Sequence, residues 1–202
     1  MALERLDPLL RRGLQPVVVR MAEVDPNGIT WFGAALGGLA ALLLFTARGP
    51  AALLGAAVLV GLSYVLDVLD GQVARAHDRQ SPWGDYLDHV LDRVVDSALL
   101  LGVAYNPTLG VTHATGLWAT VATLLGSYMG TQAAASGLGR DYGGFSRTDR
   151  LALLALAAAL AAVGPNLLGP AVIACGVGGL YTFVVRGWRA RAALTRGSGP
   201  DR

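Results

Sequence analysis

Residues 28–47, GITWFGAALGGLAALLLFTA, contain no charged side chain and are long enough to cross a membrane as one α-helix. Further uncharged runs cover residues 51–66, 99–139 and 151–185. The two longest runs each contain a turn sequence, Asn106-Pro107 in one and Gly164-Pro165-Asn166 in the other. The sequence therefore predicts six membrane spans, at about residues 28–47, 51–76, 84–105, 112–136, 148–164 and 167–187.

The composition supports an all-α integral membrane protein. Of the 202 residues 53% are hydrophobic and 15% charged, and the mean hydropathy of +0.49 excludes a large soluble domain. Cys175 is the single cysteine, so an internal disulfide is excluded, and no cluster of cysteine and histidine predicts a zinc site. The chain has no lysine, which excludes Schiff-base chemistry and a lysine-dependent phosphate loop. Because no basic face with interleaved aromatic residues is evident, we expect no nucleic-acid partner.

The charged residues predict how the spans are oriented. Residues 1–24 repeat apolar side chains at helical spacing, which indicates an amphipathic helix lying on the membrane surface or packed on the protein itself. Arginines gather before the first span, after the second, between the fourth and fifth, and after the sixth. The positive-inside rule places these segments and both termini in the cytoplasm, so we expect a multi-pass protein of the cell membrane. Residues 25–190 would form the membrane domain and residues 191–202 a cytoplasmic tail.

Small residues recur at four-residue spacing within the predicted spans, at Gly33 and Gly37 and again at Gly126 and Gly130. Small residues let helix backbones approach closely inside a membrane. These four glycines therefore predict helix-packing contacts.

Four aspartates lie at the predicted cytoplasmic ends of the second and third spans. At about 100° per residue, Asp67 and Asp70 lie roughly 60° apart on one helix, and Asp88 and Asp92 roughly 40° apart on the next. The connecting segment is short, so the two helices are antiparallel neighbours and the four carboxylates converge. Such a cluster needs protons, arginine partners or cations. Oxygen ligands favour Mg²⁺ or Mn²⁺, with Ca²⁺ as an alternative, and two ions about 3.5–4 Å apart would indicate phosphoryl transfer.

The same residues form a longer pattern. Asp67-Val-Leu-Asp-Gly-Gln-Val-Ala-Arg75 is followed by Gly84, Asp88 and Asp92 at fixed spacing. This pattern resembles the complete signature of the CDP-alcohol phosphotransferase family, and the six spans after an interfacial helix also resemble its fold. The resemblance implies a membrane enzyme that transfers the lipid phosphate of a CDP-linked lipid to an alcohol and releases CMP. It also implies a homodimer.

The resemblance implies a role for each residue of the signature. Asp67, Asp70 and Asp88 would hold one Mg²⁺ or Mn²⁺ ion and Asp67, Asp88 and Asp92 the second, with Asp92 also acting as the general base. The CDP-lipid would be bound by residues around the signature, namely Asn27, Thr30, Gly71, Ala74, Arg75, Ser81 and Gly84. Two alternatives remain open from the residues alone. Asn27 and Thr30 would also serve as caps of the first helix, and Arg75 as a cytoplasmic anchor.

The acceptor alcohol is less closely specified. Residues 127–133, SYMGTQA, resemble the members in bacteria and archaea that use an inositol phosphate, and Arg140, Arg147 and Arg150 could bind the acceptor phosphate. The bacterial members usually carry Lys and Arg where this chain has Gly130 and Gln132. The likeness of residues 127–133 and the three arginines nevertheless favour inositol 1-phosphate as the acceptor, with glycerol 3-phosphate and then serine as alternatives. The lipid is of either the diacyl or the archaeal ether kind.

Two other classes of membrane protein also place acidic residues on helices. An aspartate-rich prenyltransferase would need two similarly spaced motifs, whereas the two pairs here are spaced differently. A divalent-cation transporter would need acids along a path through the bilayer, whereas these lie at one boundary. Outside the signature, Asp96 is expected to pair with Arg93 or to make a polar packing contact, and the three histidines are expected to be structural or solvated.

Overall fold

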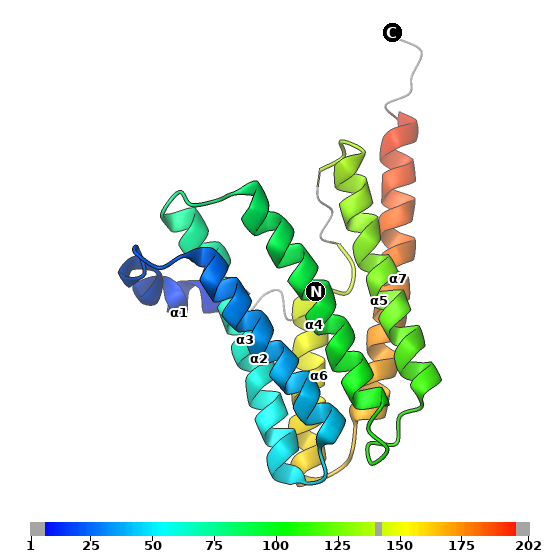
Figure 1. The fold of residues 1–202 in the computed structure, drawn as a ribbon. Helices are drawn as coiled ribbons and strands as arrows, with labels where there is room; N and C mark the ends of the chain where they lie inside the picture. The colour runs from blue at the N-terminus through cyan, green and yellow to red at the C-terminus, as the bar shows by residue number, and fades with distance from the viewer. Residues whose placement is uncertain (1–6, 140–142, 197–202) are drawn as a thin grey trace.

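The computed structural model describes residues 7–139 and 143–196, and over these ranges the chain is entirely helical (Figure 1). Seven helices follow one another within the described residues: α1 Asp7–Arg20, α2 Pro26–Thr46, α3 Pro50–Ala76, α4 Pro82–Ala104, α5 His113–Ala135, α6 Arg147–Val163 and α7 Leu168–Arg196. The prediction of an all-α fold is confirmed. Helices α2 to α6 begin and end within a few residues of the predicted spans.

The helix starts follow from local sequence. Proline stands in the first turn of α2, α3 and α4, where its missing N–H costs no hydrogen bond. Side-chain oxygens of Asp25 and Ser81 accept backbone N–H groups at the starts of α2 and α4. The prediction that Asn27 or Thr30 caps the first span is wrong, because Asp25 is the N-cap and the other two lie inside α2. Ser146 and Asp149 form a reciprocal capping box that begins α6.

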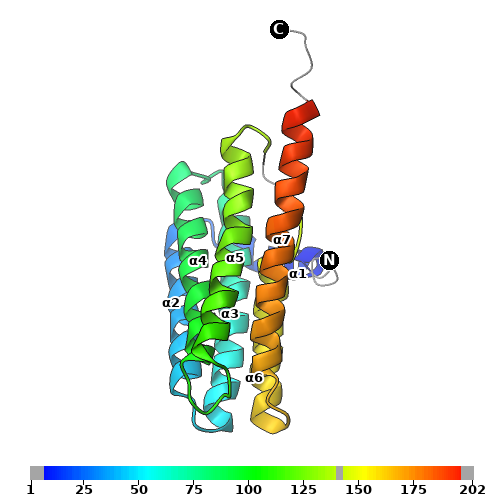
Figure 2. The same cartoon turned by 90° about the vertical axis from the view of Figure 1, so that its right-hand side faces the viewer.

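Helix α7 is longer than predicted. The apolar run ends at Val185, but the helix continues to Arg196, so residues 191–196 of the predicted tail are helical. In Figures 1 and 2 these last turns extend beyond the neighbouring helices. The extension is rich in alanine, arginine and leucine, which are the strongest helix formers, and contains no helix-breaking proline.

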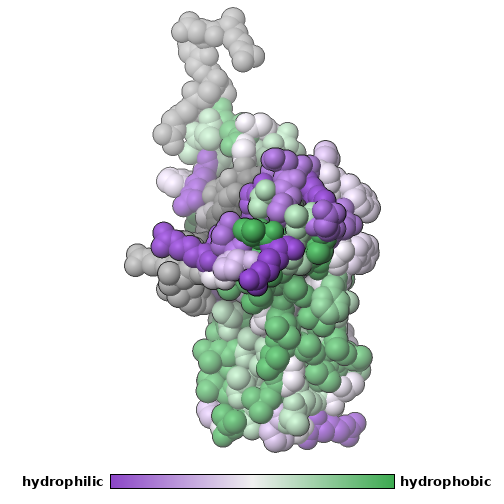
Figure 3. Space-filling model, turned by 90° about the vertical axis from the view of Figure 1, so that its left-hand side faces the viewer, coloured by the Kyte–Doolittle hydropathy of each residue, from purple (hydrophilic) through white to green (hydrophobic). Residues whose placement is uncertain are grey.

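Three helices are long and apolar enough to cross a membrane by their own composition, at Pro26–Thr46, Pro50–Ala76 and Leu168–Thr195. Figure 3 shows apolar side chains over the lower body of the molecule and polar ones gathered at its upper end. Many large apolar side chains are exposed, for example Phe32, Val58 and Leu156. An exposed apolar belt of this extent is a surface for lipid rather than for water.

The helices form two groups that meet along the bundle axis. Helix α2 packs on α3 and α4, and α5 packs along α7, while α6 joins α3 to α7 (Figure 2). Glycines permit the close crossings. A Cβ on Gly37 would lie 2.5 Å from Val95 Cγ1, and one on Gly126 would lie 2.5 Å from the Gly179 carbonyl oxygen. The prediction of helix-packing contacts is confirmed for Gly33, Gly37 and Gly126, and it stays a prediction for Gly130.

Helix α1 lies at one side of the bundle, crosswise to α2 and α3 (Figure 1). Its Val18 is fully buried against Ile29, Leu69 and Val73. The ring Nε2 of His77, which caps α3, is 3.0 Å from the Val18 carbonyl oxygen. One face of α1 is therefore packed on the protein, as one of the two sequence-based alternatives predicted.

Candidate active site

The antiparallel pair α3 and α4 brings the predicted aspartates together. Asp67 and Asp70 lie on the last turns of α3, and Asp88 and Asp92 lie on the first turns of α4. Carboxylate oxygens of Asp67, Asp88 and Asp92 all lie within 4.8 Å of one another. We refer to these three residues as the carboxylate cluster. Three carboxylates at this separation repel one another strongly, so the cluster requires positive charge beside it.

Asp70 lies beside the carboxylate cluster and is tied to α2. The Thr30 hydroxyl donates a hydrogen bond of 2.6 Å to Asp70 Oδ2 and also bonds the Pro26 carbonyl oxygen. Thr30 was predicted to contact the substrate, and in this structure it orients Asp70, the signature aspartate outside the carboxylate cluster. Asp70 and Thr30 also line the same cavity as the cluster.

Arg147, at the start of α6, supplies positive charge to the carboxylate cluster. Its Nη1 atom is 2.7 Å from Asp67 Oδ1 and 2.9 Å from Asp92 Oδ1, and its Nε is 3.5 Å from Asp96 Oδ1. The sequence predicted that Arg147 binds the acceptor phosphate. In the structure Arg147 lines the cavity and also contacts Asp67 and Asp92 of the carboxylate cluster. The predicted alternative that arginines pair with the aspartates is thus observed for Asp67 and Asp92.

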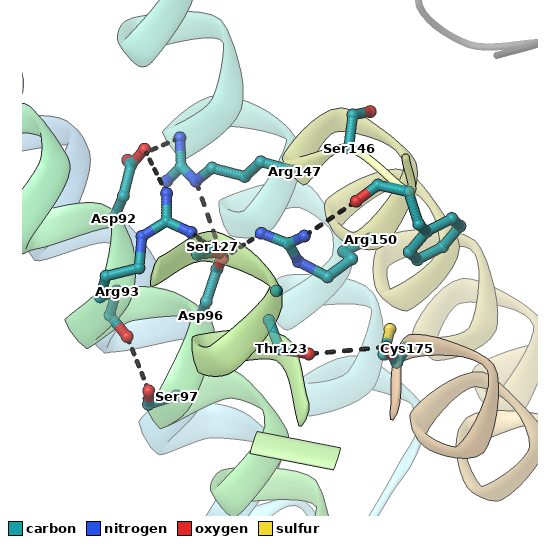
Figure 4. Close-up of polar contacts among 12 residues, drawn as sticks. Asp92, Arg93, Asp96, Ser97, Thr123, Ser127, Ser146, Arg147, Arg150 and Cys175 are labelled. Atoms are coloured by element: carbon teal, nitrogen blue, oxygen red, sulfur yellow. Dashed lines mark hydrogen bonds and ion pairs between the residues drawn. The ribbon is translucent and has the colours of Figure 1, made fainter. Parts of the chain in front are cut away.

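Asp96 forms a second centre of charge one helical turn below Asp92. Its carboxylate accepts a 2.6 Å hydrogen bond from Arg150 Nη2, and Arg93 Nη1 lies 3.9 Å away (Figure 4). Arg93 also donates to the Ser127 hydroxyl on α5. Asp96 was expected to pair with Arg93 or to make a polar packing contact, and the ion pair with Arg93 is present. Its shortest ion pair, which was not predicted, is with Arg150, one of the predicted acceptor-phosphate residues.

An open cavity of about 1160 Å³ connects these groups. Its wall includes the predicted CDP-lipid residues Asn27, Thr30, Gly71, Ala74, Arg75, Ser81 and Gly84 together with all four signature aspartates, Arg147 and Arg150. A cavity of this size holds a nucleotide and a second small substrate.

The side of the cavity that is predicted to bind the nucleotide contains small residues. A Cβ on Gly71 would lie 3.1 Å and 3.2 Å from the two terminal nitrogens of Arg75, so the guanidinium group lies directly over this glycine. A Cβ on Gly84 would lie 3.0 Å from Asn27 Oδ1, so α2 and α4 approach closely there. Ser81 is both a cavity residue and the N-cap of α4, because its hydroxyl oxygen accepts from the Gly84 amide at 3.0 Å.

The opposite side of the cavity contains a residue that sequence reasoning missed. Arg186 of α7 lines the cavity, and it donates to the carbonyl oxygens of Gly143 at 2.9 Å and Gly126 at 3.1 Å. In the sequence, Arg186 was interpreted only as one of the arginines after the sixth span that predict the orientation of the protein in the membrane. Its position as the first charge after that apolar run is the sequence signal for its place beside the aspartates, with which it lines one cavity. Arg140, the remaining predicted acceptor residue, lies outside the described residues.

The carboxylate cluster has the donor set of a divalent-metal site. Three carboxylates from two helices present oxygens within one coordination sphere of each other, and hard oxygen ligands are those that Mg²⁺ and Mn²⁺ prefer. The histidines add no second cluster: His89 Nδ1 lies 3.6 Å from Asp88 Oδ2, and His77 contacts α1. The residues present therefore fit the predicted cofactor.

Comparison with known proteins agrees with this geometry. Residues 24–185 match the family described as CDP-alcohol phosphatidyltransferase. The archaetidylinositol phosphate synthase of Methanothermobacter thermautotrophicus is 30% identical over 187 residues, which cover 91% of each chain. The phosphatidylinositol phosphate synthase of Corynebacterium glutamicum is 33% identical over 183 residues, which cover 86% of this chain and 81% of the relative.

Solved structures show the same arrangement. The phosphatidylinositol phosphate synthase of Mycobacterium tuberculosis with CDP-DAG bound matches with a TM-score of 0.69 and 27% identity, over 92% of this chain and 94% of that one. The same enzyme in complex with manganese and citrate matches with a TM-score of 0.71 over 92% and 88% of the two chains. The family match identifies an enzyme rather than a cation transporter or a prenyltransferase. From its signature, its fold and these relatives, the chain belongs to the CDP-alcohol phosphatidyltransferase family of membrane enzymes.

Proposed function

We propose that this enzyme transfers the phosphatidyl or archaetidyl group of a CDP-linked lipid to inositol 1-phosphate and releases CMP. The observation that carries the proposal is one cavity with the carboxylate cluster on α3 and α4 and with Arg147, Arg150 and Arg186 contributed by α6 and α7. The relatives named above are inositol phosphate synthases, and the two lipid kinds correspond to the bacterial and archaeal ones.

The charges of the cavity favour a phosphorylated acceptor. The four signature aspartates and Asp96 bring five negative charges, and the three arginines that contact them return three positive charges. Two divalent cations, with Asp85 and four further arginines that line the cavity, Arg11, Arg75, Arg79 and Arg186, would leave it about five positive charges. A diphosphate and a phosphate monoester together bring about four negative charges and offset most of this excess, whereas a diphosphate with a neutral alcohol would offset less than half of it.

The signature residues would bind the two metal ions and the diphosphate. Asp67, Asp70 and Asp88 would hold one ion and Asp67, Asp88 and Asp92 the other, which fits the shared oxygens of the carboxylate cluster. When bound, the ions neutralise and polarise the diphosphate. Arg75 binds a diphosphate oxygen through its planar fork of N–H groups.

Asp92 is the proposed general base, because it lies where the carboxylate cluster meets Arg147. Its carboxylate accepts the proton of the acceptor hydroxyl as that oxygen attacks the lipid-bearing phosphorus. The bond from this phosphorus to the bridging oxygen breaks, and the electron pair leaves with CMP. Arg147, Arg150 and Arg186 orient the acceptor through its own phosphate.

We further propose that α2 to α7 all span the bilayer, with α1 at the interface and both termini in the cytoplasm. The shortest of these helices, α6, has 17 residues, which at 1.5 Å each is about 26 Å and close to the hydrocarbon thickness. Arginines at the polar end support the orientation. The predicted domain limits, residues 25–190 and 191–202, and the homodimer remain predictions, and the mass of the detergent-solubilised protein tests the latter.

An acceptor screen tests the proposed function. Purified enzyme receives labelled CDP-diacylglycerol or its archaeal ether counterpart, Mn²⁺, and one acceptor from inositol 1-phosphate, glycerol 3-phosphate, serine and free inositol. We expect CMP release and a new phospholipid with inositol 1-phosphate, while free inositol gives little. The Asp92→Asn variant should lose transfer but retain CDP-lipid binding. Product from another acceptor alone would refute the proposed substrate, and wild-type turnover by Asp92→Asn would refute the assigned base.

A further inference from the structure

Asp96 is a buried charge that the family signature does not include. It follows Asp92 by one turn of α4, and only 3% of its surface is exposed. A carboxylate buried this deeply in an apolar helix is strongly unfavourable unless positive groups surround it. The packing of α4 alone therefore does not explain a charged side chain at this buried position.

The partners of Asp96 come mainly from another helix. Arg150 Nη2 lies 2.6 Å from Asp96 Oδ2, and Arg147 Nε lies 3.5 Å from Asp96 Oδ1. Both arginines belong to α6, whereas Arg93 of α4 is more distant at 3.9 Å. Figure 4 shows the guanidinium groups of Arg147 and Arg150 converging on this one carboxylate. Asp96 thus ties the cavity arginines of α6 to α4.

Arg147 depends on Asp96 for a position compatible with metal binding. Its Nη1 contacts carboxylate oxygens of Asp67 and Asp92, which are two of the three residues that could hold a divalent cation. A cation there competes with the guanidinium group for the same lone pairs and repels it. The contact with Asp96 does not involve the carboxylate cluster. This ion pair would hold Arg147 at the cavity wall while ions occupy the carboxylate cluster.

Arg150 is oriented by two contacts. Nη2 donates to Asp96, and Nη1 donates to the Phe145 carbonyl oxygen at 3.2 Å. Its Nε has no hydrogen-bond partner within the described structure, so Asp96 and one carbonyl oxygen account for its observed hydrogen bonds. Without the carboxylate, the side chain would have no charged partner near it to fix its direction.

We propose that Asp96 is a positioning residue that holds Arg147 and Arg150 for the phosphate of the acceptor. It contacts neither substrate. Its negative charge fixes two guanidinium groups at the acceptor side of the cavity, beside the proposed base Asp92. The inference rests on the proposed function in one respect, namely that the acceptor carries a phosphate.

Separate KM values for the two substrates test this role. The Asp96→Asn variant keeps the shape of the side chain and removes its charge. In the purified enzyme, we expect the KM for inositol 1-phosphate to rise at least about tenfold, because the charge-assisted hydrogen bond to Arg150 weakens and the ion pair with Arg147 is lost. The KM for CDP-diacylglycerol should change less than about twofold. Equal changes in both values, or no change in either, would overturn the proposal.

Two further variants separate positioning from folding. Asp149 is similarly buried, with 6% exposed, but its carboxylate serves the capping box of α6. Asp149→Asn should therefore lower the unfolding temperature without altering the ratio of the two KM values. If Asp96→Asn does not fold, Arg150→Gln breaks the same ion pair from α6 and should show the same selective rise. A selective rise in Asp149→Asn, or none in Arg150→Gln, would contradict the role of Asp96.

The double variant shows whether Asp96 acts through Arg150. If it does, Asp96→Asn should raise the acceptor KM much less in the Arg150→Gln background than in the wild type. Full additivity would count against the proposal. Failure of the proposed function is recognised separately: wild-type enzyme would then use a neutral alcohol as well as a phosphorylated one. Wild-type preference for the phosphorylated acceptor with no selective effect of Asp96→Asn would refute the positioning role alone.

Discussion

Replacing Gly71 by alanine should weaken CDP-lipid binding while stabilising the folded protein. The new Cβ would lie 3.1 Å and 3.2 Å from the terminal nitrogens of Arg75, closer than ordinary van der Waals contact. The guanidinium group is the far end of a flexible side chain, so it moves by a few tenths of an ångström rather than disrupting α3. Alanine in a helix interior is favoured over glycine by about 1 kcal/mol, so the unfolding temperature should not fall.

The magnitude follows from what Arg75 is proposed to bind. A hydrogen bond between charged groups contributes about 1.5–3 kcal/mol, and displacing the fork from its best geometry should forfeit about half of this. A loss of about 1.4 kcal/mol is a tenfold change in affinity. We therefore expect the KM for CDP-diacylglycerol to rise about tenfold and the KM for the acceptor to stay nearly constant.

The matched control is Gly61→Ala on the same helix. A Cβ on Gly61 meets nothing within 4 Å, so this variant gains the same helix propensity without touching Arg75. The assay measures CMP release at varied CDP-diacylglycerol, with thermal unfolding in detergent alongside. If the two variants share the same KM for CDP-diacylglycerol, the inferred contact between Arg75 and the diphosphate is wrong.

Three further predictions concern the metal and the packing of the bundle. Chelation of divalent ions should abolish CMP release, and Mg²⁺ or Mn²⁺ should restore it; activity that survives exhaustive chelation would contradict the metal site. Asn106→Ala should destabilise the protein by about 2 kcal/mol, measured by unfolding in detergent, because this buried amide donates to the Leu44 and Ala47 carbonyl oxygens at 2.7 Å and 2.9 Å. Gly102→Ala should cost about 1–3 kcal/mol in the same assay, because its Cβ would lie 2.6 Å from the Ala41 carbonyl oxygen; an unchanged unfolding temperature would show that α2 and α4 can separate freely.

The sequence predicted those parts of the site whose residues lie close together in the chain. Asp67 and Asp70 share one helix and Asp88 and Asp92 another, and a short connection leaves the two helices little choice but to pair. Helical periodicity and loop length were therefore sufficient to predict that these carboxylates meet. The signature then indicated the nucleotide residues, and the cavity includes all of them.

The parts that sequence could not predict depend on contacts between distant helices. Arg150 and Asp96 are 54 positions apart, and nothing near either residue shows that α6 packs where they meet. Arg186 looked like one more arginine of the positive-inside pattern because its neighbours Gly126 and Gly143 are brought to it only by the fold. The end of α7 was missed for a different reason, since an apolar run marks where a span stops and not where its helix stops.

The division of the cavity between helices has an evolutionary consequence. The signature aspartates stand on α3 and α4, whereas Arg147, Arg150 and Arg186 stand on α6 and α7. Mutation can therefore alter one half of the molecule to accommodate a new headgroup while the other half keeps handling the activated lipid. One ancestral scaffold gives rise in this way to enzymes for chemically different membranes, provided that the two halves stay matched where Arg147 and Arg150 meet Asp67, Asp92 and Asp96.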